Sequence, residues 1–163
     1  MTGELRGESF GTHFMDAPEK LIEGSGQLTS IFGYWPSFHD AEVIEFNLWR
    51  GDVDPDVGRY VFPVLTTKVH LWELTSEVNA QGYLVSRHHT LATLRFHEVD
   101  ELKMADFNHQ NAILGLNITT EERADSGPHG FRVAFDPAFG MGAVFHCARI
   151  EVVGVEPFTR RDR

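Results

Sequence analysis

The sequence has almost no cysteine: Cys147 is the single one among 163 residues. One thiol cannot form an internal disulfide, and zinc or iron–sulfur sites built from several cysteines are excluded. Because Cys147 lies in the apolar segment AVFHCARIEVV, we expect an inert core thiol rather than a nucleophile. This cysteine usage fits a reducing compartment and predicts a cytoplasmic protein.

Long apolar runs and familiar catalytic motifs are also missing. No segment approaches the roughly 20 apolar residues of a membrane helix, and the start, MTGELRGESF, has no basic region followed by an apolar one. The sequence contains no P-loop and no dinucleotide fingerprint. The segment GESFG, residues 7–11, matches the Gly-x-Ser-x-Gly pattern, but no strand is predicted before it, as a nucleophile elbow requires. We therefore expect no membrane association, no cofactor and no serine-hydrolase chemistry.

Basic side chains are scarce relative to acidic ones. The chain has 14 Lys and Arg against 24 Asp and Glu, a net charge of −10, which disfavours direct nucleic-acid binding because such binding needs cations to neutralise phosphates. Residues 1–56 hold eleven acidic and three basic side chains, a net charge of −8. This asymmetry is typical of a face that meets a basic partner, although acidity also serves to keep a protein in solution.

Hydrophobic periodicity predicts one short helical region followed by strands. Between Pro18 and Phe32 apolar residues recur at helical spacing, and Gly24 and Gly26 interrupt them, so we expect a short helix or two helical turns. After Pro36 the apolar period changes to two. The expected strands cover residues 41–50, 64–74, 90–96, 102–107, 113–119, 131–135 and 143–155, the last with a bulge, and residues 51–59 form a hairpin loop.

These elements predict a mainly β or α+β fold. About seven strands with short turns, and no helix long enough to connect parallel strands, favour a single antiparallel sheet-based domain with one short N-terminal helix. We expect a flexible or edge arm over residues 1–17, one β-rich domain over 18–157 and a basic tail over 158–163. The buried faces of two strands are predicted to be Ile44, Phe46, Leu48 and Leu114, Leu116, Ile118.

Nine histidines raise the question of a metal or catalytic site. None stands in a His-x-x-x-His pair or a His-Glu-x-x-His arrangement, and the adjacent His88 and His89 should point to opposite faces of a strand. We predict no metal site and no catalytic residues. A small enzyme or metal-binding domain that uses His39, Asp40 and His97 is the alternative.

The densest segment is GYWPSFHDAEV, residues 33–43. Large rings, among them Trp35 and Phe38, surround Pro36, and His39 and Asp40 follow at the entrance to the first strand. One interpretation is a corner pinned by aromatic side chains, in which Asp40 hydrogen-bonds to backbone donors and His39 orients it. The other is a binding or catalytic role, and the two can coexist.

The stretch FGYWPSFHDAEV, followed by IEFNLWR, resembles the opening signature of the immunity protein 50 family of bacterial polymorphic toxin systems. The segments TLRFHEVDEL, FNHQNAILGLNI and EVVGVEP extend the similarity over about residues 31–157. The resemblance implies a β-rich cytosolic antidote that binds a cognate toxin and blocks it, without turnover. The family motif falls on Pro36, Phe38, His39, Asp40, Ala41, Glu42 and Val43.

Motif and charge together give the predicted partner-binding residues. They are Trp35, Pro36, Phe38, His39, Asp40 and Glu42 from the motif, and Glu45, Asp52, Asp54 and Asp56 from the acidic first third. An acidic surface suits a toxin with a basic active cleft, such as a nuclease. A third reading is a protein that pairs with its own copy through an exposed strand edge.

Overall fold

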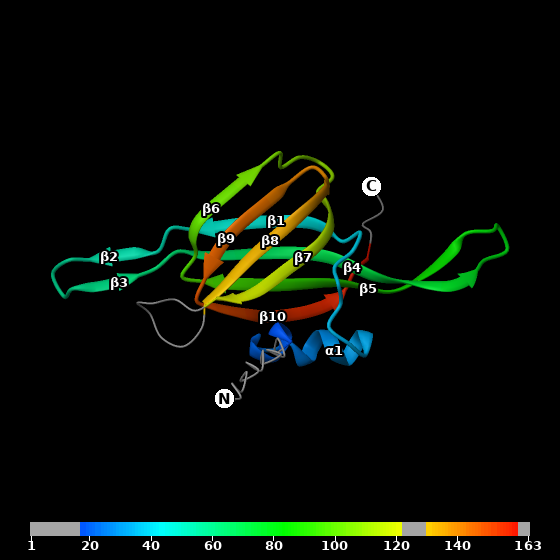
Figure 1. Ribbon diagram of the computed structural model, residues 1–163, viewed down its shortest axis with the longest axis horizontal. Coiled ribbons are helices and arrows are strands. Elements are labelled where there is room, and N and C mark those ends of the chain that lie inside the picture. Colours follow the sequence, from blue (N-terminus) through cyan, green and yellow to red (C-terminus); the bar gives the residue numbers. More distant parts are fainter. Residues whose placement is uncertain (1–16, 122–129, 160–163) are drawn as a thin grey trace, which may run out of the picture.

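The computed structural model describes residues 17–121 and 130–159 and confirms the predicted fold class. The described part is mainly β, with a 3₁₀ turn and one short α-helix, and has ten strands where the sequence predicted about seven (Figure 1). The elements are η1 Pro18–Leu21, α1 Gly26–Phe32, β1 Glu42–Trp49, β2 Asp52–Asp54, β3 Arg59–Val61, β4 Val64–Val78, β5 Leu84–His97, β6 Asp100–Ala105, β7 Ala112–Glu121, β8 Gly130–Phe139, β9 Gly142–Cys147 and β10 Arg149–Pro157.

Eight strands form one antiparallel sheet in the order β10-β5-β4-β1-β7-β8-β9-β6. The first four and the last four make two halves that meet where Glu42 of β1 pairs with Ala112 of β7, and the strands of the second half cross those of the first (Figure 1). The core lies between the halves: the ring centroid of Phe145 on β9 is 5.0 Å from that of Phe96 on β5.

The helical segment closes one side of this core. Leu28 and Phe32 of α1 are buried, and α1 contacts β5 and β10. Glu23 forms a parallel bridge to Glu151 of β10, which covers part of that edge strand. Gly24 has φ +70°, and a Cβ there would lie 2.6 Å from the Val152 carbonyl oxygen, so this close approach requires glycine. Among the described residues, no helix is long and apolar enough to span a bilayer.

Bulges change which side chains face the core. In β1 the register shifts between Val43 and Glu45, so Val43 takes the buried position and Ile44 is 47% exposed. Phe46 packs against the core, whereas Leu48 at the strand's end is 51% exposed. The predicted burial of Ile44 was therefore wrong because regular alternation does not show an inserted residue, and that of Leu48 was wrong because the core does not extend to the end of β1.

The same effect occurs in β7, where the register shifts on both sides of Ile113. Leu116 and Ile118 are buried as predicted, but Leu114 is 54% exposed and Ile113 faces the core in its place. The predicted single strand over residues 143–155 was also wrong. It is divided at Ala148 into β9, which pairs in the second half, and β10, which pairs in the first.

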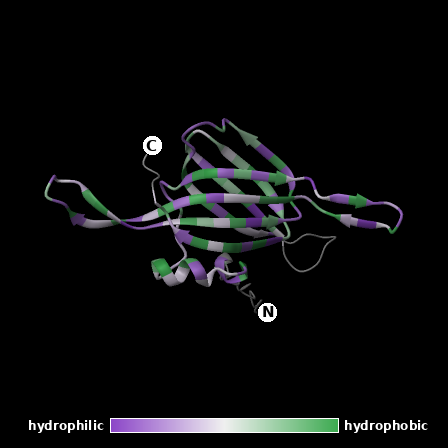
Figure 2. Cartoon of the chain, turned by 180° about the vertical axis from the view of Figure 1, so that it is seen from behind, coloured by the Kyte–Doolittle hydropathy of each residue, from purple (hydrophilic) through white to green (hydrophobic). Residues whose placement is uncertain are grey.

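Two hairpins project from opposite ends of the sheet (Figure 1). The predicted loop after β1 contains two short paired strands, β2 and β3, and we call residues 51–61 the acidic hairpin. At the other end β4 and β5 continue past the sheet, and we call residues 73–87 the β4–β5 arm. Both projections carry hydrophobic segments (Figure 2).

Candidate functional site

The family-like motif forms a tight turn, which we call the corner (residues 35–43). The Ala41 N–H donates to the Phe38 carbonyl at 3.1 Å, and Phe38 and Asp40 have φ of 60° and 62°. A positive φ is unusual for a bulky residue such as Phe38 and persists only where the surroundings hold it. Aspartate accepts this conformation more readily, because its short polar side chain suits the left-handed region.

The corner holds the two halves of the sheet together. The Asp40 N–H donates to the Ile113 carbonyl at 3.0 Å, and the Ile113 N–H donates to the Ala41 carbonyl at 2.9 Å. Asn111, only 4% exposed, completes the seam: its carbonyl accepts from the Val43 N–H at 2.9 Å, and its Oδ1 accepts from the Met141 N–H at 3.2 Å. Sequence reasoning missed Asn111, although it lies within the motif-bearing segment FNHQNAILGLNI.

The aromatic part of the corner is buried, as expected for a pinned turn. Phe38 is 2% exposed, Trp35 packs against its ring at a centroid distance of 5.7 Å, and Pro36 is buried. The side chains of His39 and Asp40 are 63% and 60% exposed, and their Nδ1 and Oδ2 atoms lie 3.1 Å apart. The prediction that the Asp40 carboxylate binds backbone donors was wrong: it points outward and pairs with His39.

The other four acidic residues that were predicted to bind the partner lie outside the corner. Glu45 pairs with Lys68, with 2.9 Å between Oε2 and Nζ. Asp52, Asp54 and Asp56 lie in the acidic hairpin, which follows the far end of β1. Seven residue steps of strand separate Glu42 from Trp49, or about 23 Å at the usual rise. The structure therefore divides the predicted partner-binding residues between the two ends of β1.

Large apolar side chains are exposed beside the aspartates. Tyr60 is 61% exposed and Val57 71% exposed, and the residues flanking the hairpin, Trp49 and Phe62, are 49% and 57% exposed. Clustered exposed aromatic residues are typical of protein–protein interfaces, in which Trp and Tyr often supply most of the binding energy. This end of the molecule combines three aspartates, one arginine (Arg59, opposite Asp54) and exposed aromatic side chains on one narrow ribbon.

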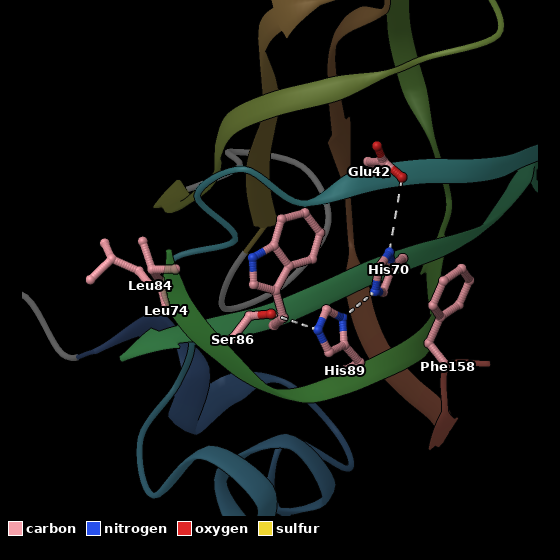
Figure 3. A pocket seen from close by; sticks show the side chains of 8 residues that line it. Glu42, His70, Leu74, Leu84, Ser86, His89 and Phe158 are labelled. Atoms are coloured by element: carbon pink, nitrogen blue, oxygen red, sulfur yellow. Dashed lines mark hydrogen bonds and ion pairs between the residues drawn. The ribbon is translucent and has the colours of Figure 1, made fainter. Parts of the chain in front are cut away.

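The opposite end contains a pocket of about 490 Å³ at the base of the β4–β5 arm (Figure 3). Its position follows from strand alternation, because His70 and Trp72 point away from the core face of Val69 and Leu71. Glu42 of the family motif reaches the same pocket from β1. The described lining residues are Glu42, His70, Trp72, Leu74, Leu84, Ser86, His89 and Phe158.

A chain of polar contacts crosses the pocket (Figure 3). Ser86 Oγ lies 2.9 Å from His89 Nε2, and His89 Nδ1 lies 3.0 Å from His70 Nε2. The chain ends at Glu42, whose Oε2 is 3.9 Å from His70 Nδ1. Each imidazole nitrogen can donate or accept according to the tautomer of its ring, so one chain of hydrogen bonds can run from Ser86 through both histidines toward Glu42.

A bulge directs His89 into this pocket. The register between β4 and β5 shifts between Leu71 and Glu73, and the opposing His88 has φ of 57°. The His88 ring contacts Phe32 of α1 at a centroid distance of 5.9 Å, whereas His89 contacts His70. The two histidines thus face opposite sides, as predicted, but the pairing of His70 with His89 depends on the strand register, which cannot be derived from the residues alone.

Two further contacts involve segments that flank β4 and β5, one in the pocket and one outside its lining. Phe158, which the sequence analysis assigned to the tail, stacks on His70 at 3.6 Å between centroids, and its N–H donates to the His89 carbonyl at 2.9 Å. Tyr34 donates a hydrogen bond from its hydroxyl to Glu73 Oε1 at 3.2 Å. Partial desolvation, together with Glu73, raises the pKa of the Tyr34 phenol.

The alternative catalytic set is not brought together. His97 lies beside Val64, which pairs with Trp49 at the far end of β1, and its Nε2 is 3.2 Å from Glu151 Oε2. His39 and Asp40 precede the near end of β1. Within residues 17–121 and 130–159, no group of three or more His, Cys, Asp or Glu side chains is arranged to hold a metal ion.

A protein-family model described as Immunity protein 50 matches residues 24–158. The chain belongs to the Immunity protein 50 family. Searches of curated proteins and of solved structures gave no match to the chain. The matched range includes the corner, the acidic hairpin and the pocket, and membership of the Immunity protein 50 family indicates a protein that binds a toxin and acts as an immunity protein.

Proposed function

We propose that this immunity protein neutralises its cognate toxin by docking the acidic hairpin against a basic active cleft, such as that of a nuclease. The observation that carries the proposal is the hairpin itself. It projects beyond the sheet and presents Asp52, Asp54 and Asp56 beside exposed aromatic residues. Such a ribbon supplies both the charge that attracts a basic surface and the apolar area that holds it.

The two kinds of side chain have different roles in this proposal. Tyr60 and the neighbouring Trp49 and Phe62 act as anchors, because burying large exposed rings is favourable and costs little conformational entropy. The aspartates steer the encounter, since complementary charge mainly raises the association rate. Glu45, farther back on β1, is already paired with Lys68 and contributes less.

The hairpin is held in shape at its base. Gly51 has φ +83°, and a Cβ there would collide with the Val61 carbonyl oxygen, so the two strands close tightly at this point. Asp52 Oδ1 and Asp54 Oδ1 accept hydrogen bonds from the Val53 and Asp56 N–H groups at 2.9 and 3.2 Å. A ribbon ordered before binding loses less entropy when it docks.

In this proposal the protein acts in the cytoplasm of the toxin-producing cell. It blocks the toxin by occupying its active cleft and catalyses no reaction itself. The first test is whether the toxin encoded beside this protein is lethal alone and harmless on co-expression. The second uses Asp52→Asn, Asp54→Asn and Asp56→Asn combined, which we expect to reduce protection while the protein melts as the native form does.

A matched control removes the same charge elsewhere. Glu101, Asp106 and Glu156 are exposed outside the hairpin, and their combined replacement by Gln or Asn should leave protection intact. If the hairpin variant protects as well as the native protein, the hairpin is not the docking face. If the native protein gives no protection, the proposed neutralisation itself is wrong.

A further inference from the structure

We propose that the pocket at the base of the β4–β5 arm binds an arginine side chain that the toxin presents. The identity of the partner rests on the proposed function, whereas the chemistry of the pocket stands on its own residues. Nothing in the family match assigns this pocket a ligand. It would give the immunity protein a second point of contact at the end of the sheet away from the acidic hairpin.

The charge of the pocket favours a cation. Among the eight described lining residues, Glu42 is the one carboxylate, and none is Lys or Arg. Its side chain is 33% exposed, and its Oε2 lies 3.9 Å from His70 Nδ1, too long for a hydrogen bond. The carboxylate therefore has capacity to accept N–H groups from an occupant.

The shape of the pocket favours a planar cation. The aromatic and imidazole rings of the lining stack on one another, with 5.7 Å between the centroids of Trp72 and His89 and 3.6 Å between those of His70 and Phe158, so an occupant can stack only on their outward-facing surfaces. A guanidinium can stack on such aromatic faces while it forms paired hydrogen bonds with a carboxylate. The compact ammonium of lysine can approach an aromatic face, but it has no planar pair of donors to match a carboxylate.

The rim of the pocket suits the rest of an arginine side chain. Leu74 and Leu84 are 58% and 50% exposed, and both lie on the β4–β5 arm. The aliphatic stem of an arginine buries readily along such apolar surface while the charged head reaches beyond it. The volume of about 490 Å³ falls within the range of sites that hold small ligands.

The test is an NMR titration with argininamide, compared with citrullinamide, its neutral isostere, and lysinamide. We expect argininamide to shift the Trp72 indole and His89 ring signals saturably. Citrullinamide should give no saturable shift, and lysinamide should bind at least tenfold more weakly. Glu42→Gln should weaken argininamide binding about tenfold or more. Glu156→Gln, an equal charge change near Phe158 but outside the lining, should leave it unchanged.

Three results would overturn the proposal. Equal binding of argininamide and citrullinamide would show that charge is not recognised, and equal binding of lysinamide would remove the preference for a planar cation. The third concerns the chain's own Arg160, Arg161 and Arg163, which follow Phe158 closely in the sequence. If argininamide binds only after these three are changed to Gln, the tail and not the toxin supplies the occupant.

The titration uses no toxin, so its outcome is separate from that of the protection assay. If the pocket binds argininamide but the protein protects against no toxin, the proposed ligand chemistry of the pocket is supported and the toxin is not its partner. Conversely, if the protein protects but does not bind argininamide, the proposed neutralisation is supported and the proposed arginine site is wrong. Melting of Glu42→Gln at the native temperature shows that a lost signal reflects the pocket and not the fold.

Discussion

The two ends of the sheet differ in how many of their residues also hold the sheet together. The acidic hairpin has its own strand pairing, and its large side chains, Val57 and Tyr60 among them, are mostly exposed. The pocket end is built on the corner: Glu42 lines the pocket and also forms the pair with Ala112 that joins the two halves. One end is an addition to the sheet, and the other shares residues with its central seam.

This difference has a consequence for mutagenesis. Changes in the hairpin should alter recognition and leave stability nearly untouched, because little is buried there. Changes at the corner and pocket affect both, since a side chain such as Phe38 supports the seam as well as the neighbouring site. A loss of protection can therefore be assigned directly to binding at the first end and only after a stability measurement at the second.

The largest contrast should come from truncating one aromatic residue at each end. Phe38→Ala removes a ring that is 2% exposed, and we expect a loss of about 3–5 kcal/mol in the free energy of unfolding. Tyr60→Ala removes a ring that is 61% exposed and should change that energy by no more than about 0.5 kcal/mol. Urea unfolding of both variants measures the contrast, and equal losses would show that the hairpin is part of the cooperative core.

Binding kinetics should separate the two ends in a different way. The triple Asp→Asn variant of the hairpin should lower the association rate with the toxin about tenfold at low salt and hardly at all at high salt, because exposed charges are screened. Glu42→Gln should instead raise the dissociation rate about tenfold, since it removes one partner of a desolvated pair. Surface plasmon resonance at two salt concentrations resolves both rates. Dissociation that is unchanged by Glu42→Gln would place the pocket outside the interface.

Each end of the sheet could be predicted only as far as its hydrophobic residues alternate regularly along the sequence. The antiparallel sheet and the buried Leu65, Leu94 and Phe131 could be predicted because regular alternation shows directly in the residues. The exposure of Ile44 and Leu114 could not, because each lies beside a bulge next to the seam. Bulges depend on how the strands are paired, and one sequence without a register does not contain that information.

The candidate site shows the same division. The acidic residues of the hairpin were found from charge and turn composition alone, which are local properties. The pocket was missed because His70, His89 and Phe158 are far apart in sequence, and it forms only when β4 pairs with β5 and the chain end returns to His89. Of its residues, only Glu42 was predicted, through the family motif.

A smaller effect should come from the turn at the corner. Asp40 has φ of 62° and an exposed side chain, so its backbone conformation matters more than its charge. Asp40→Ala should cost about 1 kcal/mol, because alanine resists the left-handed region, whereas Asp40→Gly should cost less. Thermal unfolding of the two variants measures the order. Equal losses for Gly and Ala would mean that the contact with His39, which both variants remove, stabilises the turn rather than the backbone preference.

The smallest effect concerns the hydrogen bond between Tyr34 and Glu73, which ties the segment before the corner to the β4–β5 arm. Because the pKa of the Tyr34 phenol is raised in the folded protein, the neutral hydroxyl is the favoured form there. Its contribution to stability is thus fully present below about pH 10, the ordinary tyrosine value, and is lost as the pH rises through the folded pKa. Since Tyr34 is 53% exposed, Tyr34→Phe should lower the free energy of unfolding by no more than about 0.5 kcal/mol at neutral pH. Glu73→Gln should move the Tyr34 pKa down toward its ordinary value, which an NMR titration of the Tyr34 ring measures. An unchanged titration would assign the raised pKa to desolvation alone, and the arm would then have no electrostatic tie to the corner through this pair.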